Sequence, residues 1–108
     1  MKNEFLENWH SQLRKGLLPL YVLHILDQKQ CYGYELIQDI KAVFSVDVAE
    51  GTLYPLLIRL MKEELLTHQW VEQPSGIPRK YYAISAVGKS NLAEMKAYTN
   101  LIITKING

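Results

Sequence analysis

Three histidines and one cysteine are the side chains best suited to act as nucleophiles, general bases or metal ligands in this chain. His10, His24 and His68 lie far apart without the close spacing of metal ligands, and Cys31 has no recognisable base partner. The sequence also lacks a glycine-rich phosphate loop and a nucleophile elbow. We therefore predict that the protein is not an enzyme and holds no metal and no cofactor. Cys31 is interpreted as a buried, inert thiol, with oxidant sensing as the alternative.

The cationic side chains indicate a different chemistry, the recognition of phosphates and base edges. Each of the three arginines has a lysine nearby: Arg14 with Lys15, Arg59 with Lys62, and Arg79 with Lys80. The 12 lysines and arginines nearly balance the 11 aspartates and glutamates, which leaves a net charge of +1. This balance excludes a protein that coats nucleic acid through overall charge. A nucleic-acid binder of this composition must gather its positive charge on one face.

Length and composition indicate an ordinary globular chain. With 108 residues, 48% hydrophobic and 21% charged, it can bury a real core. A single cysteine forms no intrachain disulfide, and the first residues do not resemble a secretory signal. The longest apolar stretch, residues 17–26, is too short to span a bilayer. We expect a cytoplasmic protein with no membrane partner.

Apolar periodicity predicts the elements that position these side chains. Helices are expected over residues 3–13, 17–26, 32–43, 51–65 and 85–105, with a break at Gly16 and Pro19 in the first turn of the second helix. A turn-rich loop separates two strands, residues 67–72 and 79–84, and forms a hairpin with them. The predicted fold is mainly α (α+β), a winged helix-turn-helix with an N-terminal helix and a long C-terminal dimerisation helix. We divide it into a DNA-binding part, residues 1–84, and a dimerisation helix, residues 85–108.

Four motifs carry a family resemblance in addition to this pattern. They are YGYEL at 32–36, EGTLYPLL at 50–57, RL at 59–60 and RKYY at 79–82, with Gly88 beyond. In this order they resemble the PadR family of bacterial transcriptional regulators, in its short subgroup with a single C-terminal helix. The resemblance implies a dimeric DNA-binding repressor that a small molecule or another signal releases from its operator. It also implies that residues 51–65 form the recognition helix, the hairpin forms the wing, and the first and last helices form the dimer interface.

The chemistry of the motif residues agrees with a DNA-binding face. A recognition helix buries one face and offers the other to the major groove, whose base edges carry a distinct code of donors and acceptors. Tyr54 can instead be half-buried, and Glu35 and Glu50 are interpreted as partners for nearby basic side chains. The predicted DNA contacts are polar or cationic: Lys15, Tyr32, Tyr34, Thr52, Tyr54, Arg59, Lys62, Arg79 and Lys80.

The apolar residues of the terminal helices exceed what one small winged helix needs. A stripe left exposed on a monomer is covered when it pairs with a second copy about a two-fold axis. The predicted dimerisation residues are Phe5, Leu6, Trp9, Leu92, Met95, Leu101, Ile102 and Ile106. A planar aromatic effector is predicted to stack between the subunits against Trp9, Leu13, Met95, Tyr98 and Ile102, with plain dimer packing as the alternative.

A second class of function remains open. The chain could be a winged-helix dimer that serves as a protein-interaction or ligand-binding module without sequence-specific DNA binding. The salt dependence of DNA binding separates the two, because a regulator with several phosphate contacts loses affinity steeply as salt rises.

Overall fold

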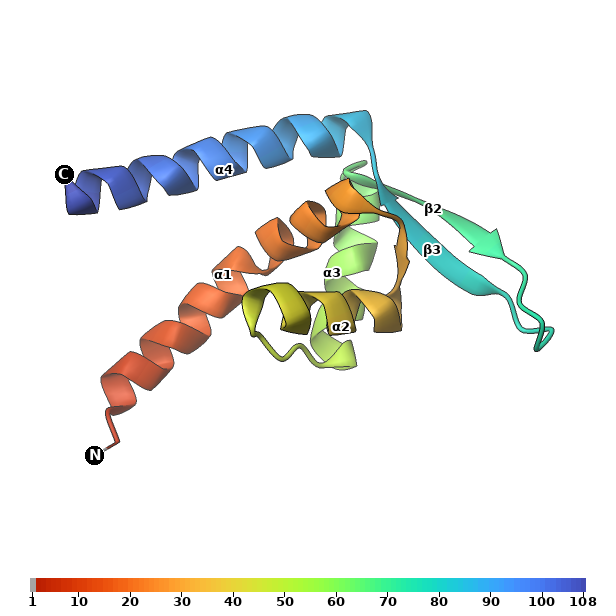
Figure 1. The fold of residues 1–108 in the computed structure, drawn as a ribbon, viewed down its shortest axis with the longest axis horizontal. Helices are drawn as coiled ribbons and strands as arrows, with labels where there is room; N and C mark the ends of the chain where they lie inside the picture. The colour runs from red at the N-terminus through yellow and green to blue at the C-terminus, as the bar shows by residue number, and fades with distance from the viewer. Residues whose placement is uncertain (1) are drawn as a thin grey trace.

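The computed structural model describes residues 2–108, and within that range the chain forms four α-helices and a three-stranded antiparallel sheet (Figure 1). The predicted fold class is confirmed. Met1, the first residue of the predicted DNA-binding part, lies outside the described residues. The elements in chain order are α1 Glu4–Gln28, β1 Cys31–Tyr32, α2 Gly33–Phe44, α3 Glu50–Lys62, β2 Leu66–Val71, β3 Arg79–Ile84 and α4 Ala86–Asn107.

Helix α1 is continuous, so the predicted break at Gly16 is wrong. Asn3 caps the helix by accepting a hydrogen bond from the backbone N–H of Leu6 at 3.1 Å, and the helix then runs through Gly16 and Pro19. A proline inside a helix costs about 3 kcal/mol, but a single buried leucine side chain stabilises by a comparable amount. The second half of α1 buries five such residues, and this packing outweighs the local preference for a break: Leu18, Val22, Leu23, Ile25 and Leu26.

Strand β1 lies in a segment that the sequence predicts as a polar break followed by a helix start. Cys31 pairs with Tyr82, and Tyr32 pairs with Tyr81, which makes β3 the central strand in the order β1-β3-β2. A strand of two residues shows no periodicity, and the partner that defines it lies some fifty residues away. Tyr32 is therefore the last residue before α2 and not its first turn, which corrects the prediction for this residue.

The predicted hairpin is confirmed, with β2 and β3 paired from Leu66 opposite Ile84 to Val71 opposite Arg79. Helix α3 ends three residues earlier than predicted. Glu64 adopts a left-handed conformation with φ of 63°, and the Leu65 N–H donates to the Leu60 carbonyl at 2.9 Å. The chain turns here because Leu65 and Leu66 are both buried, and a longer helix would carry them away from the core.

The core lies between the second half of α1, helices α2 and α3, and one face of the sheet. Its fully buried members include Leu23, Leu36, Ile40, Leu53, Leu57 and Leu60. Helix α4 is fastened to this core by Ser85, whose hydroxyl accepts from the Gly88 N–H at 2.9 Å and donates to the Glu64 carbonyl at 2.7 Å. In Figure 1 the first half of α1 and the second half of α4 extend from one side of the core, and the hairpin extends from the other.

Candidate nucleic-acid interface

Helix α3 has one buried face and one open face, as a helix that enters a DNA groove requires. Leu53, Leu57 and Leu60 are its core contacts. The opposite face is exposed to solvent and holds six side chains or backbone positions: Gly51, Thr52, Pro55, Ile58, Arg59 and Lys62. Ala49 precedes the helix without a side-chain cap. The first backbone N–H groups of α3 are therefore left without such a partner.

A basic hollow lies where α3 meets α1. Lys15, Thr52 and Arg59 line a space of about 340 Å³ with an apolar floor that includes Leu18. An adjoining space of about 180 Å³ adds Arg14 from the same side of α1. The structure thus brings Lys15 of α1 close to Thr52 and Arg59 of α3, which lie more than thirty residues later in the chain. All three are predicted DNA contacts. The cationic side chains that border these two spaces are Arg14, Lys15 and Arg59, and Asp47 lines the adjoining space with them.

The start of α2 meets the wing near the loop end of β3. The Arg79 guanidinium lies 4.3 Å from the centre of the Tyr32 ring, and the centres of the Tyr32 and Tyr81 rings lie 5.4 Å apart in an edge-to-face arrangement. An arginine stacked on an aromatic ring is held in place while its N–H groups stay free to donate. Tyr34, the second residue of α2, is exposed. Arg79 and Tyr32 are therefore in contact, and Tyr34 follows Tyr32 by two residues at the start of α2.

Tyr54 occupies the side of α3 that faces α2 and the sheet. Its ring lies directly against Gly33, and its proximity adds to burial in raising the pKa of Tyr82. Tyr54 is 38% exposed, so the half-buried alternative considered for this residue describes it correctly. The ring fixes the distance between α2 and α3. The hydroxyl end of the ring lies against Gly33 and not on the outward face, so a base contact by Tyr54 is the least supported of the predicted set.

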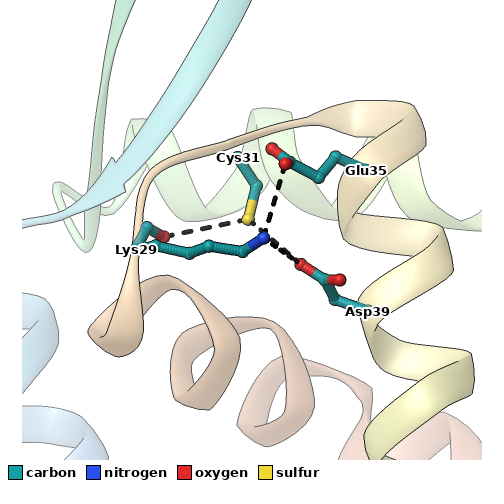
Figure 2. Close-up of polar contacts among 4 residues, drawn as sticks. All are labelled: Lys29, Cys31, Glu35 and Asp39. Carbon is teal, nitrogen blue, oxygen red and sulfur yellow. Dashed lines mark hydrogen bonds and ion pairs between the residues drawn. The ribbon is translucent and has the colours of Figure 1, made fainter.

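A polar cluster that the sequence analysis did not foresee fixes the start of α2 to the end of α1 (Figure 2). The Lys29 ammonium lies between two carboxylates of α2, at 3.4 Å from Glu35 and 3.0 Å from Asp39. The Cys31 thiol donates to Asp39 at 3.7 Å and to the Lys29 carbonyl at 3.8 Å. The interpretation of Glu35 as a partner for a basic side chain is confirmed. The cluster spans β1 and so determines where the α2 N-terminus points.

The cluster also sets the state of the thiol. Burial, followed by the negative charges of Glu35 and Asp39, raises the pKa of Cys31 to about 12, although Lys29 opposes this. The same carboxylates raise the pKa of Lys29, chiefly through the hydrogen bond to Asp39. A buried thiol with such a pKa is protonated near neutral pH, which is the opposite of a reactive cysteine.

The wing carries an exposed aromatic residue, Trp70, which the sequence predicts only as part of a strand. Trp70 is 62% exposed, and the Lys80 ammonium lies 5.8 Å from its ring and 5.5 Å from that of Tyr82. Beyond the strands, Ile77 is exposed near the tip of the loop. Lys80 therefore lies among aromatic rings on the wing face opposite to Arg79, since neighbouring residues of a strand point to opposite faces.

The predicted effector residues meet in one apolar groove between α1 and α4. The groove measures about 470 Å³, and Trp9, Leu13, Met95, Tyr98 and Ile102 all line it. Most predicted dimerisation residues are also exposed on these helix halves, namely Phe5, Leu6, Trp9, Leu101, Ile102 and Ile106, with Met95 partly buried. Leu92 is different, because it is 3% exposed and packs in the core one turn after Gly88. We therefore leave Leu92 out of the surface available to a partner.

Residues 2–108 contain neither a candidate metal-binding cluster nor a candidate membrane-spanning helix. No group of three or more histidine, cysteine, aspartate or glutamate side chains in this range could hold a metal ion. None of the helices in the described range combines the length and the apolar character needed to cross a membrane.

Comparison with known proteins agrees with this geometry. Residues 22–94 match the model of the transcriptional regulator PadR-like family. The chain is similar to the crystal structure of a PadR-like transcription factor from Bacteroides fragilis, with 40% identity, a TM-score of 0.79, and coverage of 93% of this chain and 96% of that one. For a PadR-like transcriptional regulator from Bacillus cereus the identity is 37%, the TM-score 0.78, and the coverage 89% and 93%. For a PadR family transcriptional regulator from Eggerthella lenta the identity is 31%, the TM-score is 0.85, and the coverage is 96% of this chain and 90% of that one.

Proposed function

The chain belongs to the PadR-like family of transcriptional regulators, and from that premise we propose that it is a homodimeric repressor that a small molecule releases from its operator. As a member it is a DNA-binding regulator with a winged helix fold, and not an enzyme. Because its target is chromosomal DNA, we propose that it acts in the cytoplasm. The observation that carries the proposal is the division of the molecule into a cationic recognition surface and two apolar helix halves that its own core leaves uncovered.

The recognition surface supplies two kinds of contact in this proposal. The outward face of α3 enters the major groove, while the basic hollow formed by Lys15, Thr52 and Arg59 seats a phosphate at the groove edge. Arg79 on its Tyr32 platform and Lys62, at the C-terminal end of the outward face of α3, contact the flanking backbone. Arg59 lies at the border of the hollow and not at the centre of the exposed face. This position favours a phosphate contact over a base contact.

The uncovered helix halves support dimerisation. All buried residues of α1 lie at or after Leu18, and those of α4 are Gly88 and Leu92, so about half of each helix has no core contact. These halves expose large apolar side chains, with Phe5 75% and Ile106 73% exposed. A helix of 22 residues is about 33 Å long, and a second copy can cover this whole stripe through a two-fold interface. The same axis sets two recognition helices about 34 Å apart when the half-sites are one DNA turn apart.

The groove between α1 and α4 supports a small-molecule effector. Its lining is almost entirely apolar and includes the aromatic rings of Trp9 and Tyr98, between which a planar aromatic molecule can stack. The groove runs along the surface proposed for dimerisation. A ligand in it therefore alters the relative placement of the two subunits, and with it the distance between recognition helices.

A titration of DNA binding against salt tests the regulator proposal. Fluorescence anisotropy with labelled fragments is expected to show an affinity that falls with log salt at a slope of about −0.9 for each phosphate neutralised. Arg79→Ala is expected to weaken binding to all duplexes alike, while the matched charge removal Lys96→Ala, on exposed α4, leaves it unchanged. A dimer that binds no fragment even at low salt would instead favour the protein-interaction or ligand-binding module.

Oligomeric state and ligand binding need separate measurements. Sedimentation velocity at micromolar concentration is expected to give a dimer, and a monodisperse monomer would contradict the proposal. For the effector, Trp70→Phe leaves Trp9 as the sole indole, so that its emission reports on the groove. Quenching by planar aromatic compounds that is absent in Trp9→Phe supports the effector site. No change with any of them would favour plain dimer packing.

A further inference from the structure

Gly51 is a glycine that the fold itself does not require. It is the second residue of α3, it is exposed, and it does not adopt a left-handed conformation. A Cβ atom added at Gly51 meets nothing within 4 Å. In contrast, a Cβ at Gly33 would collide with the Tyr54 ring, and one at Gly88 would collide with the Leu65 carbonyl. Glycine is less favourable than alanine in a helix, so its presence at this open position points to a constraint from outside the chain.

The carbonyl of the same residue lacks its normal helical donor. The residue four positions ahead is Pro55, whose nitrogen carries no hydrogen, so the Gly51 carbonyl receives no i+4 hydrogen bond. Gly51 is exposed and has no side chain to cover its own carbonyl, next to which the Pro55 ring lies in place of the missing donor. One residue therefore combines an exposed backbone with a carbonyl that lacks its usual helical donor.

Along the centre of this face, Pro55 and Ile58 carry no side-chain hydrogen-bond donor, and Lys62 follows Ile58 at the end of the helix. Gly51, Pro55 and Ile58 follow one another at helical spacing along the outward face, and Ile58 is 50% exposed. Thr52 and Arg59 lie to one side, along the hollow with α1, and Tyr54 lies to the other side, against α2. The centre of the face is thus a narrow strip without polar side chains from the Gly51 carbonyl to Ile58.

We propose that this strip is the base-reading part of α3 and that Gly51 reads through its backbone. Its carbonyl accepts a hydrogen bond from an exocyclic amino group in the major groove, where adenine N6 and cytosine N4 are the donors on base edges. The missing side chain lets α3 approach closely enough for this contact, and Ile58 lies one to two turns further on, against a thymine methyl group. Specificity then comes from a backbone acceptor and apolar contact, while the cations contact phosphates. The inference rests on the proposed function.

The variant Gly51→Ala tests the proposal in the full-length protein. Because an added Cβ meets nothing in the chain, thermal unfolding followed by circular dichroism is expected at the same or a higher temperature. Affinity for the best fragment selected from a random duplex library is expected to fall by about tenfold or more, with an unchanged salt slope. Ser90→Ala, at an exposed position of α4, is the control for improved helix propensity and is expected to bind like the unsubstituted protein.

A base-analogue scan identifies the donor. Replacing adenine by purine, or cytosine by its analogue without the amino group, is expected to weaken binding by about tenfold at one position of each half-site. At that position Gly51→Ala is expected to show no further loss. A variant that binds the selected fragment as tightly as the unsubstituted protein would overturn the inference and leave the regulator proposal intact. If the unsubstituted protein binds no duplex at low salt, the regulator proposal and the inference about Gly51 are both refuted.

Discussion

The buried thiol of Cys31 gives a sharp quantitative prediction, because its side chain is fully buried and its pKa is raised to about 12. At about pH 8, a thiol with this pKa is ionised in only about one molecule in ten thousand, whereas an ordinary cysteine with a pKa of about 8.5 is ionised in about one in four. Since the thiolate is the reactive form, alkylation of the folded protein is expected to be about a thousandfold slower than that of the denatured chain. The alternative, an oxidant sensor, requires a Cys31 thiolate that reacts readily in the folded protein.

The assay is a time course with iodoacetamide, followed by mass spectrometry, in buffer and in concentrated urea. Labelling through global unfolding sets a floor near one part in a thousand to ten thousand for a domain that is stable by about 5 kcal/mol. Asp39→Asn removes one of the negative charges that disfavour the thiolate, so it is expected to speed labelling of the folded protein. A native rate within about tenfold of the denatured rate would refute the reasoning and restore the sensor interpretation.

Three further predictions concern the pH dependence of stability, the glycines of α2 and α4, and the dimer interface. The folded-state pKa of Cys31 lies above its unfolded value, so its contribution to the free energy of unfolding is fully present below the unfolded pKa. That contribution is lost as pH rises toward about 12, at up to about 1.4 kcal/mol per pH unit. The midpoints of urea unfolding should show this loss, and Cys31→Ala should reduce it. Gly88→Ala is expected to lower the unfolding temperature more than Gly33→Ala, because its Cβ meets the rigid Leu65 backbone and not a movable side chain, and equal shifts in calorimetry would contradict this. Ile102→Asp is expected to shift sedimentation toward monomer while leaving the circular dichroism spectrum intact, since Ile102 is exposed in the chain; an unchanged dimer would remove it from the interface.

The parts of the fold that sequence could predict are those with local causes. The hairpin was predictable because its loop, residues 73–78, is rich in proline, serine and glycine and separates two strand-forming runs. Helix α1 was divided wrongly because Gly16 and Pro19 are local helix breakers, while the burial that overrides them depends on elements far along the chain. Strand β1 was missed for a similar reason, since it exists only through its pairing with β3.

The candidate site was predictable by residue type and less so by arrangement. Motif residues such as Thr52 and Arg79 are exposed, but nothing in the spacing shows that Lys15 borders the same hollow as Arg59. Trp70 is predictable only as part of a strand, because aromatic residues favour strands, and the structure shows that its ring is uncovered. The open position of Gly51 also depends on the absence of neighbours, which a sequence does not record.

The continuity of α1 has a mechanical consequence. Its 25 residues form a rod of about 37 Å that begins in the groove with α4 and ends at the core beside α2 and α3. A tilt of about 5° in such a lever displaces its far end by about 3 Å, which is as long as the hydrogen bonds that recognise a base. A small movement at the free end is thus converted at the core into a displacement large enough to misalign contacts with DNA.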